Sequence, residues 1–231
     1  MTKVISFGHR CSSASFIKLL NLKTESYPFD WMISKLNTIK QCIETDFKDF
    51  FNIEHYTYKN SETYNMIDGK KVHICCETVF VNMLYETNPD NNQTYNYQLG
   101  FNHNNVKNDP VYYDRCIERF KDVLNSEIKK ITIYFHPIVG DIDFNNNKIS
   151  ILKEFNDFNV YIQTKTSNIF GLYFITVVTQ NVNKSEIIES TDTYTVYVIY
   201  CNENFLDGGD PCMGNCSSEI NEVIRIIQSY V

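Results

Sequence analysis

The thiol of Cys11 lies where a chain can present a nucleophile. It follows the apolar run VISF, which is typical of a short strand, and Gly8, and it precedes the helical stretch SSASFIKLL. A thiol at a strand-to-helix turn lies close to unpaired helix N–H groups and to the positive end of the helix dipole, which favour the thiolate. The alternative is a buried core cysteine, as many free cysteines are.

Two later histidines could supply the base that such a thiol needs. His103 lies in FNHNN and His136 in YFHP. A histidine that accepts the thiol proton is the usual partner of a nucleophilic cysteine. His136 precedes a proline at a strand end, so we expect it to have a structural role, and we expect His9 to be a turn residue.

Asp30 and Trp31 form the pair DW in the segment ESYPFDWMIS. Asp30 is either a site carboxylate or an acceptor that holds a buried turn through backbone N–H groups, and we favour the turn. Trp31 is expected to pack in the core.

The eight cysteines are expected to be reduced. Cys212 and Cys216 are four residues apart and Cys201 precedes them, but no clear second pair accompanies them, since adjacent Cys75 and Cys76 point to opposite faces if they lie on a strand. We therefore expect neither a structural metal nor any other cofactor.

Hydrophobic spacing predicts the elements that position these residues. One helix should begin at Ser34 as its N-cap, and another at Pro110 after the cap Asp109. The first carries Leu36, Ile39, Ile43, Phe47 and Phe50 on one face, and the second carries Tyr113, Cys116, Ile117, Phe120, Val123 and Leu124. A closing helix carries Ile220, Val223, Ile224 and Ile227. Strands are expected in KKVHICCETVF, in YNYQLGF and at 130–135, 159–164, 172–179 and 193–201.

The order of these elements favours an α+β fold, in which a mainly antiparallel sheet packs on helices, because helices dominate the first half and strands the second. The last two strands are expected to be antiparallel neighbours. The alternative is a three-layer α/β Rossmann-like fold, with VISF, ITIYF and VYVIY as parallel strands. Residues 1–231 are expected to form a single domain.

Composition excludes several classes of protein. The hydrophobic fraction of 43%, with 16 Tyr and 16 Phe, indicates a folded domain, and the net charge of −7 makes nucleic acid an unlikely partner. No apolar stretch of about 18 residues exists, so we expect a soluble, cytoplasmic protein without a membrane partner. Its oligomeric state stays open.

Residues 4–51 resemble the opening of a family described as putative papain-like cysteine peptidases, with members in bacteria and in large DNA viruses of protists. The resemblance rests on ISFGHRC, on YPFDW and on the acidic, Phe-rich helix TIKQCIETDFKDFF. A histidine motif of the family matches Phe101, Asn102 and His103, and YYDRCIERFKDVLNSEIKKITIYF resembles the next helix and strand. The resemblance covers roughly residues 4–136.

This resemblance implies a papain-like fold and a thiol hydrolase or peptidase that attacks an amide or isopeptide bond of a protein or peptide. It implies that Cys11 is the nucleophile and His103 its base. Asn104 stands beside His103 where the family has an aspartate, and it can orient the imidazole through its amide oxygen. Asp141 or Asp143 could take that role. If the chain is viral, it acts in the host-cell cytoplasm.

Two other functions remain open. The first helix N-terminus could bind a phosphate in an α/β enzyme acting on a nucleotide or carbohydrate, although no GxGxxG or Walker pattern is present. Alternatively, the chain is a non-enzymatic interaction module.

Overall fold

The computed structural model describes residues 2–8, 11–67, 70–85, 99–101, 104–139, 141–179, 184–201 and 217–231. His9, His103, Cys212 and Cys216, which carry expectations from the sequence, lie outside these residues.

The larger of two sheets has five strands in the order β1-β6-β7-β9-β8. The pairs β1–β6, β6–β7 and β7–β9 are parallel, and the edge strand β8 is antiparallel to β9. The carboxyl ends of β1, β6, β7 and β9 therefore meet at one edge, which we call the carboxyl edge. The strands are β1 (Thr2–Ser6), β6 (Lys129–Val139), β7 (Ile169–Val178), β8 (Lys184–Ser190) and β9 (Tyr194–Cys201).

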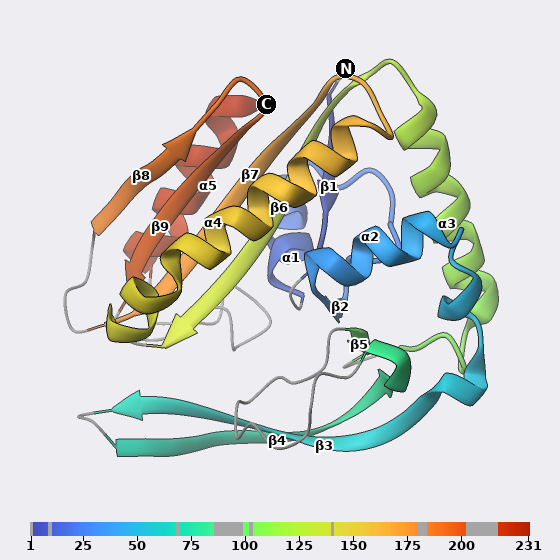
Figure 1. The fold of residues 1–231 in the computed structure, drawn as a ribbon, viewed down its shortest axis with the longest axis horizontal. Helices are drawn as coiled ribbons and strands as arrows, with labels where there is room; N and C mark the ends of the chain where they lie inside the picture. The colour runs from blue at the N-terminus through green and yellow to red at the C-terminus, as the bar shows by residue number, and fades with distance from the viewer. Residues whose placement is uncertain are drawn as a thin grey trace.

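The smaller sheet is antiparallel throughout, in the order β2-β5-β4-β3, and Figure 1 shows it beyond the carboxyl edge of the larger one. Its long β3–β4 hairpin extends away from the helices. Its strands are β2 (Met32–Ser34), β3 (Tyr56–Ile67), β4 (Lys70–Asn82) and β5 (Leu99–Phe101).

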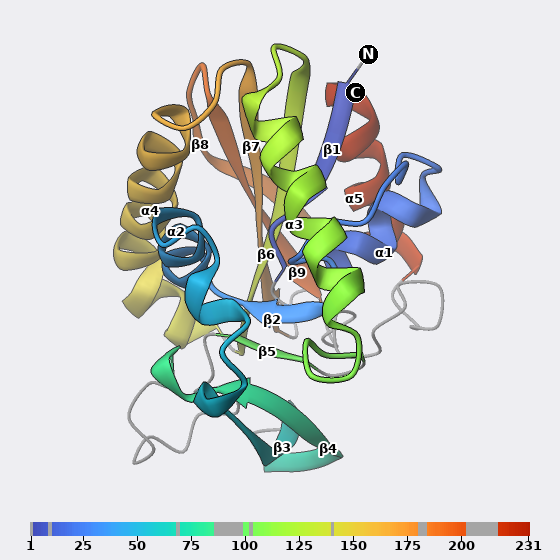
Figure 2. The ribbon, with the colours of Figure 1, turned by 90° about the vertical axis from the view of Figure 1, so that its right-hand side faces the viewer.

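Helices cover both faces of the larger sheet, as Figure 2 shows with α2 and α4 on one side and α1 and α5 on the other. The core on the first side also includes α3, and that on the second side packs α1 and α5 against β6, β7 and β9. The helices are α1 (Ser12–Leu19), α2 (Leu36–Glu44), α3 (Pro110–Asn125), α4 (Asp141–Gln163) and α5 (Ser217–Tyr230), with 3-10 turns at Lys48–Phe50, Ile53–His55 and Met83–Tyr85.

The predicted class is confirmed in its broad terms, because helices pack on an antiparallel sheet and on a mixed one. The strands VISF, ITIYF and VYVIY are nevertheless all parallel, as in the alternative fold. The prediction that the strands at 172–179 and 193–201 are antiparallel is wrong. The polar stretch between them contains β8, which reverses the chain once more, so that β9 runs in the same direction as β7.

The prediction of a strand at 159–164 is also wrong, because α4 continues to Gln163. The alternation in VYIQ imitates a strand, whereas the buried residues of the whole segment recur at helical spacing. They are Phe144, Ile151, Phe155, Phe158 and Ile162.

The predicted helix after Ser34 begins and ends differently. Ser34 is the last residue of β2 and Lys35 is the N-cap of α2. The helix ends at Glu44, but Phe47 and Phe50 remain in the core, because Phe47 takes a left-handed conformation (φ 59°) that turns the chain back.

The prediction for α3 is confirmed. The Asp109 carboxylate accepts a hydrogen bond from the Tyr112 N–H (3.0 Å), and Pro110 occupies the first turn. All six residues of the predicted stripe are buried. On the predicted face of α5, Ile224 is only half-buried, and Ile226 is buried in addition to the other three.

Candidate active site

Cys11 is the N-cap residue of α1 at the carboxyl edge, the position that the sequence predicts. Its carbonyl oxygen accepts the first hydrogen bond of the helix, from the Ser15 N–H (2.9 Å). Only 4% of the residue is exposed, and Ser12 and Ser13 beside it are buried as well. The thiol is thus held at a helix N-terminus inside the protein.

Three buried serines hold the turn between β1 and Cys11, and we call them the serine clamp: Ser6, Ser13 and Ser34. The hydroxyl of Ser6 accepts from the Gly8 N–H (3.2 Å), and that of Ser13 donates to the Gly8 carbonyl (2.7 Å). The hydroxyl of Ser34 donates to the Phe7 carbonyl (3.0 Å). Each hydroxyl thus satisfies one buried backbone group of Phe7 or Gly8, so these two residues are held in place by hydrogen bonds.

Glycine is required at position 8 for two independent reasons. Its φ of +83° lies in the region that side chains disfavour. A Cβ atom there would also lie 1.8 Å from the Ser34 hydroxyl oxygen and 3.1 Å from the Phe29 carbonyl oxygen. The segments FGHRC and PFDWMIS, which carry the family resemblance, therefore pack directly on each other.

Strand β2 connects this turn to β5. Ser34 pairs with Leu99, and Met32 pairs with Phe101. His103 follows Phe101 by two residues along the chain. The strand that contacts the Cys11 turn is therefore the neighbour of the strand that leads to the predicted base.

Asn104 lies on the surface at the start of the loop before α3. Its amide oxygen accepts from the Asn105 N–H (3.1 Å), and its amide nitrogen lies 3.4 Å from an Asp109 carboxylate oxygen. The Tyr113 hydroxyl donates to the Asn104 carbonyl (2.8 Å), which attaches the loop to α3. Of the two other candidates for the orienting residue, Asp141 begins α4 and Asp143 is exposed in its first turn.

His136 lies near the carboxyl end of β6, but its surroundings differ from those of Cys11. Its ring centroid is 5.9 Å from that of Phe155 in α4 and 6.5 Å from that of Tyr134. The neighbouring Phe135 points to the opposite face, where it stacks on Phe16 of α1 (5.3 Å). His136 therefore packs on the α4 face of the sheet, whereas α1 covers the other face.

Charges around His136 keep its ring neutral. Burial and the nearby Lys35 ammonium lower the pKa of His136 to about 4. Burial also lowers the pKa of Lys35, which Glu154 opposes, and raises the pKa of Glu154, which Lys35 opposes. The sequence gives no sign of this group, because its members come from three separate elements.

Asp30 holds a turn, as predicted. Its Oδ2 atom accepts from the Tyr27 N–H (2.8 Å) and from the Lys23 ammonium, while Oδ1 is buried without a hydrogen-bond partner. Burial raises the pKa of this carboxyl group, and the Lys23 charge opposes the rise. The expectation that Trp31 packs in the core is wrong: Trp31 is half-buried, and the Lys23 ammonium lies 5.8 Å from its ring.

Four buried cysteines of the described residues lie outside any disulfide: Cys11, Cys42, Cys116 and Cys201. Burial raises the pKa of Cys42 to about 12, against a hydrogen bond with Tyr85, which disfavours its thiolate at neutral pH. Within the described ranges, no group of three or more His, Cys, Asp or Glu residues could hold a metal ion.

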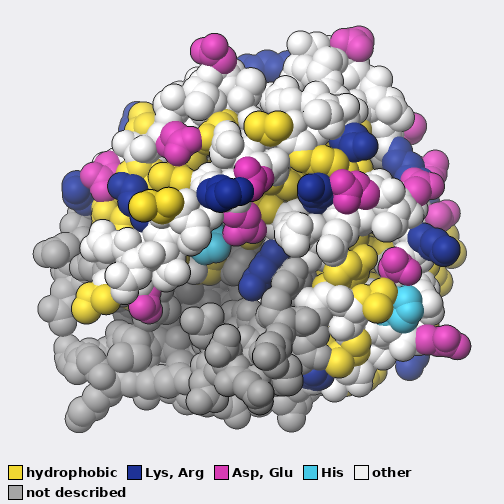
Figure 3. All heavy atoms as spheres, viewed as in Figure 1, with side chains coloured by type: hydrophobic (Ala, Val, Ile, Leu, Met, Phe, Trp, Pro, Cys, Tyr) yellow, Lys and Arg dark blue, Asp and Glu magenta, His cyan; other side chains and the backbone are white. Residues whose placement is uncertain are grey.

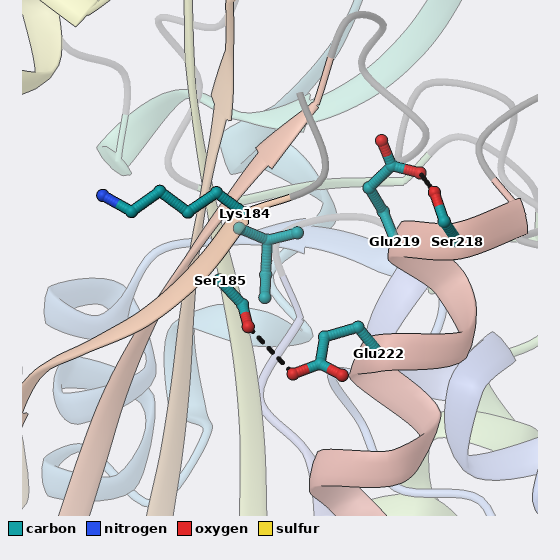
Figure 4. Close-up of a pocket in the computed structure, with 6 residues that line it drawn as sticks. Lys184, Ser185, Ser218, Glu219 and Glu222 are labelled. Carbon is teal, nitrogen blue, oxygen red and sulfur yellow. Dashed lines mark hydrogen bonds between the residues drawn. The ribbon is translucent and has the colours of Figure 1, made fainter. Parts of the chain in front are cut away.

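A cavity of about 420 Å³ lies elsewhere on the molecule, between β8, β9 and the start of α5 (Figure 4). Glu222 accepts a hydrogen bond from Ser185 there (2.8 Å), and the Glu219 carboxylate accepts one from Ser218. Its described lining includes no cysteine or histidine.

Lys and Arg side chains alternate with Asp and Glu on the face in Figure 3, so the described part of this face carries no continuous basic patch. No helix in the described part of the chain is long and apolar enough to cross a membrane.

No curated protein and no solved structure matches the chain significantly. A family model does match it, over residues 2–181, which include β1, the Cys11 turn, both motifs that meet at Gly8, and the strands through β7. The match extends beyond the part in which the sequence alone suggested a resemblance. The chain belongs to the family described as "Putative papain-like cysteine peptidase".

Proposed function

We propose that the protein is a thiol hydrolase that cleaves an amide or isopeptide bond, with Cys11 as nucleophile, His103 as its base and Asn104 as the residue that orients the imidazole. The observation that carries this proposal is the position of Cys11: a serine-clamped turn holds it at the N-terminus of α1. Helix N–H groups and the helix dipole stabilise a thiolate there.

The pairing of β2 supports His103 as the base. Met32 and Ser34 join the Cys11 turn to β5, and His103 lies two residues beyond Phe101, the last residue of that strand. Two residues span at most about 7 Å. His103 is therefore tethered close to the strand that contacts the nucleophile turn.

In the proposed reaction, the Cys11 thiolate adds to the carbonyl carbon of the substrate, and the negative charge moves to the carbonyl oxygen. The Cys11 backbone N–H is a candidate donor to that oxygen. The protonated His103 then gives its proton to the leaving amine as the C–N bond breaks. Water, deprotonated by His103, hydrolyses the thioester and restores the thiol.

We infer that the substrate is a protein or peptide, as the family description suggests. We also infer a reducing compartment such as the cytoplasm, of the host if the chain is viral, because four buried cysteines of the described core form no disulfide. Cys11 is only 4% exposed, so a local opening of the protein must uncover the thiol, to a small electrophile as well as to a substrate.

Hydrolysis of a library of quenched peptide and isopeptide substrates tests the proposal. Cys11→Ala is expected to abolish turnover, His103→Ala to lower kcat/KM by about 100- to 10,000-fold, and Asn104→Ala to lower it less. Cys42→Ala, which removes another buried thiol, is the matched control and should retain activity. Turnover that survives in Cys11→Ala contradicts the proposal.

A second function is favoured by one observation, the parallel order of β1, β6, β7 and β9. In parallel sheets, ligands often bind at the carboxyl edge, and a helix N-terminus there can hold a phosphate. If the chain binds such an anion, nucleotides or sugar phosphates should protect Cys11 from alkylation at millimolar concentration. The absence of protection would exclude this function.

A further inference from the structure

Ser34 is the member of the serine clamp that comes from outside the β1–α1 unit. It ends β2, is fully buried, and donates to a carbonyl 27 residues earlier in the chain, that of Phe7. Ser6 and Ser13 belong to the two elements that flank the turn. Of the three serines, Ser34 is therefore the one that ties the turn to the smaller sheet.

The contact is steric as well as polar. The space that a Cβ atom on Gly8 would occupy is already filled by the Ser34 hydroxyl oxygen. The hydroxyl cannot leave without opening a void beside the turn, and the turn cannot move toward β2. The Phe7–Gly8 peptide is thus fixed from one side by β2, while Ser13 in the first turn of α1 fixes the Gly8 carbonyl.

The position of this turn decides where the Cys11 thiol lies relative to the α1 N-terminus. Cys11 follows Gly8 by three residues, and the N–H groups that stabilise a thiolate act only over the first helical turn. A small displacement of the turn weakens that interaction and so disfavours the thiolate.

We propose that Ser34 is a positioning residue for Cys11: its hydroxyl, acting through the Phe7–Gly8 turn, holds the thiol where the α1 N-terminus stabilises the thiolate. This inference rests on the proposed role of Cys11 as nucleophile. It assigns to the PFDWMIS segment the role of presenting the nucleophile, and it makes the smaller sheet part of the active-site framework.

The test is the pH dependence of Cys11 alkylation by iodoacetamide, with the modified residue identified by mass spectrometry. In Ser34→Ala the rate at pH 7 should fall about tenfold, the effect of losing one hydrogen bond from the turn, and the profile should shift to higher pH. Ser13→Ala should act in the same direction, and the double variant should lose less than the product of the two effects, because both hydroxyls hold one turn.

Thr166→Val is the matched control. It removes another buried hydroxyl that donates to a backbone carbonyl, that of Leu124, and it lies just before the amino end of β7, at the opposite end of the larger sheet from the carboxyl edge. It should lower the urea midpoint without moving the alkylation profile. This comparison separates positioning from general loss of stability.

Each outcome decides between the two proposals. A reactive Cys11 whose profile is the same in wild type and in Ser34→Ala overturns the positioning role and leaves the nucleophile intact. A wild-type Cys11 that reacts no faster than Cys42 overturns both. A shifted profile in Ser34→Ala with an unshifted one in Thr166→Val supports the positioning role.

Discussion

The Ser34 hydroxyl oxygen lies 1.8 Å from the position that a Cβ atom on Gly8 would take. The two residues are 26 positions apart in the sequence, and their contact brings the turn before Cys11 against the end of β2. A single hydroxyl thus connects the end of β2, in the smaller sheet, to the segment that leads from β1 toward the candidate nucleophile.

Gly8→Ala should lower the free energy of unfolding by at least about 2 kcal/mol, because it adds both a steric clash and a strained backbone at φ +83°. Urea denaturation measures the change. In a Ser34→Gly background the clash disappears but the strain remains, so the additional cost of Gly8→Ala should be smaller. An equal cost in both backgrounds would show that the Ser34 contact is unimportant.

Lys130 is fully buried, and its ammonium group donates to the carbonyls of Ser126, Ile128 (3.1 Å) and Ser167 (3.0 Å). Lys130→Met should destabilise the protein by about 2–4 kcal/mol, because three carbonyl oxygens lose a charged donor. Lys129→Met, at the exposed neighbour, is the control and should change the urea midpoint little. Similar midpoints for both variants would contradict the assigned role of Lys130.

Stability should fall in acid because of His136. Its folded-state pKa of about 4 lies below the unfolded value near 6.5, so the unfolded chain binds more protons between these pH values. The contribution of the neutral ring is fully present above pH 6.5 and is lost as the pH falls toward 4. It is on the order of 2 kcal/mol, after allowing for the partial exposure of the ring.

His136→Gln isolates this effect from the titration of Lys35, Glu154 and Tyr134, which face the ring or lie near it. The difference between wild type and His136→Gln in urea-derived stability should shrink as the pH falls from 6.5 to 4. A difference that is constant over this range would show that the ring is not held neutral.

Elements whose ends are determined by nearby residues, such as a cap or a proline, could be predicted from the sequence. Asp109, Pro110 and a six-residue apolar stripe were sufficient for α3. The strand order of the larger sheet depends on β8, whose polar sequence KSEIIES gives little indication of a strand, so the direction of β9 could not be read from the sequence. The end of α4 was misread because a short alternating run is compatible with either element.

For the candidate site, too, the sequence predicted the local features and not the contacts between distant segments. A glycine followed by a cysteine between a strand and a helix located Cys11 at the N-terminus of α1. The serine clamp was not predictable, since a serine before a helix is typical of an N-cap, and the true partner of Ser34 is a backbone carbonyl of another sheet. Such contacts arise only once the chain has folded.

Incubation of the protein with a peptide vinyl sulfone, followed by intact-mass analysis and tandem mass spectrometry, tests the nucleophile most directly. A reactive thiolate adds to the vinyl group and forms a thioether, which survives denaturation and digestion. The account predicts one adduct, at Cys11, which is absent in Cys11→Ala and slower to form in His103→Ala. No adduct, or equal modification of Cys11 and Cys42, would contradict it.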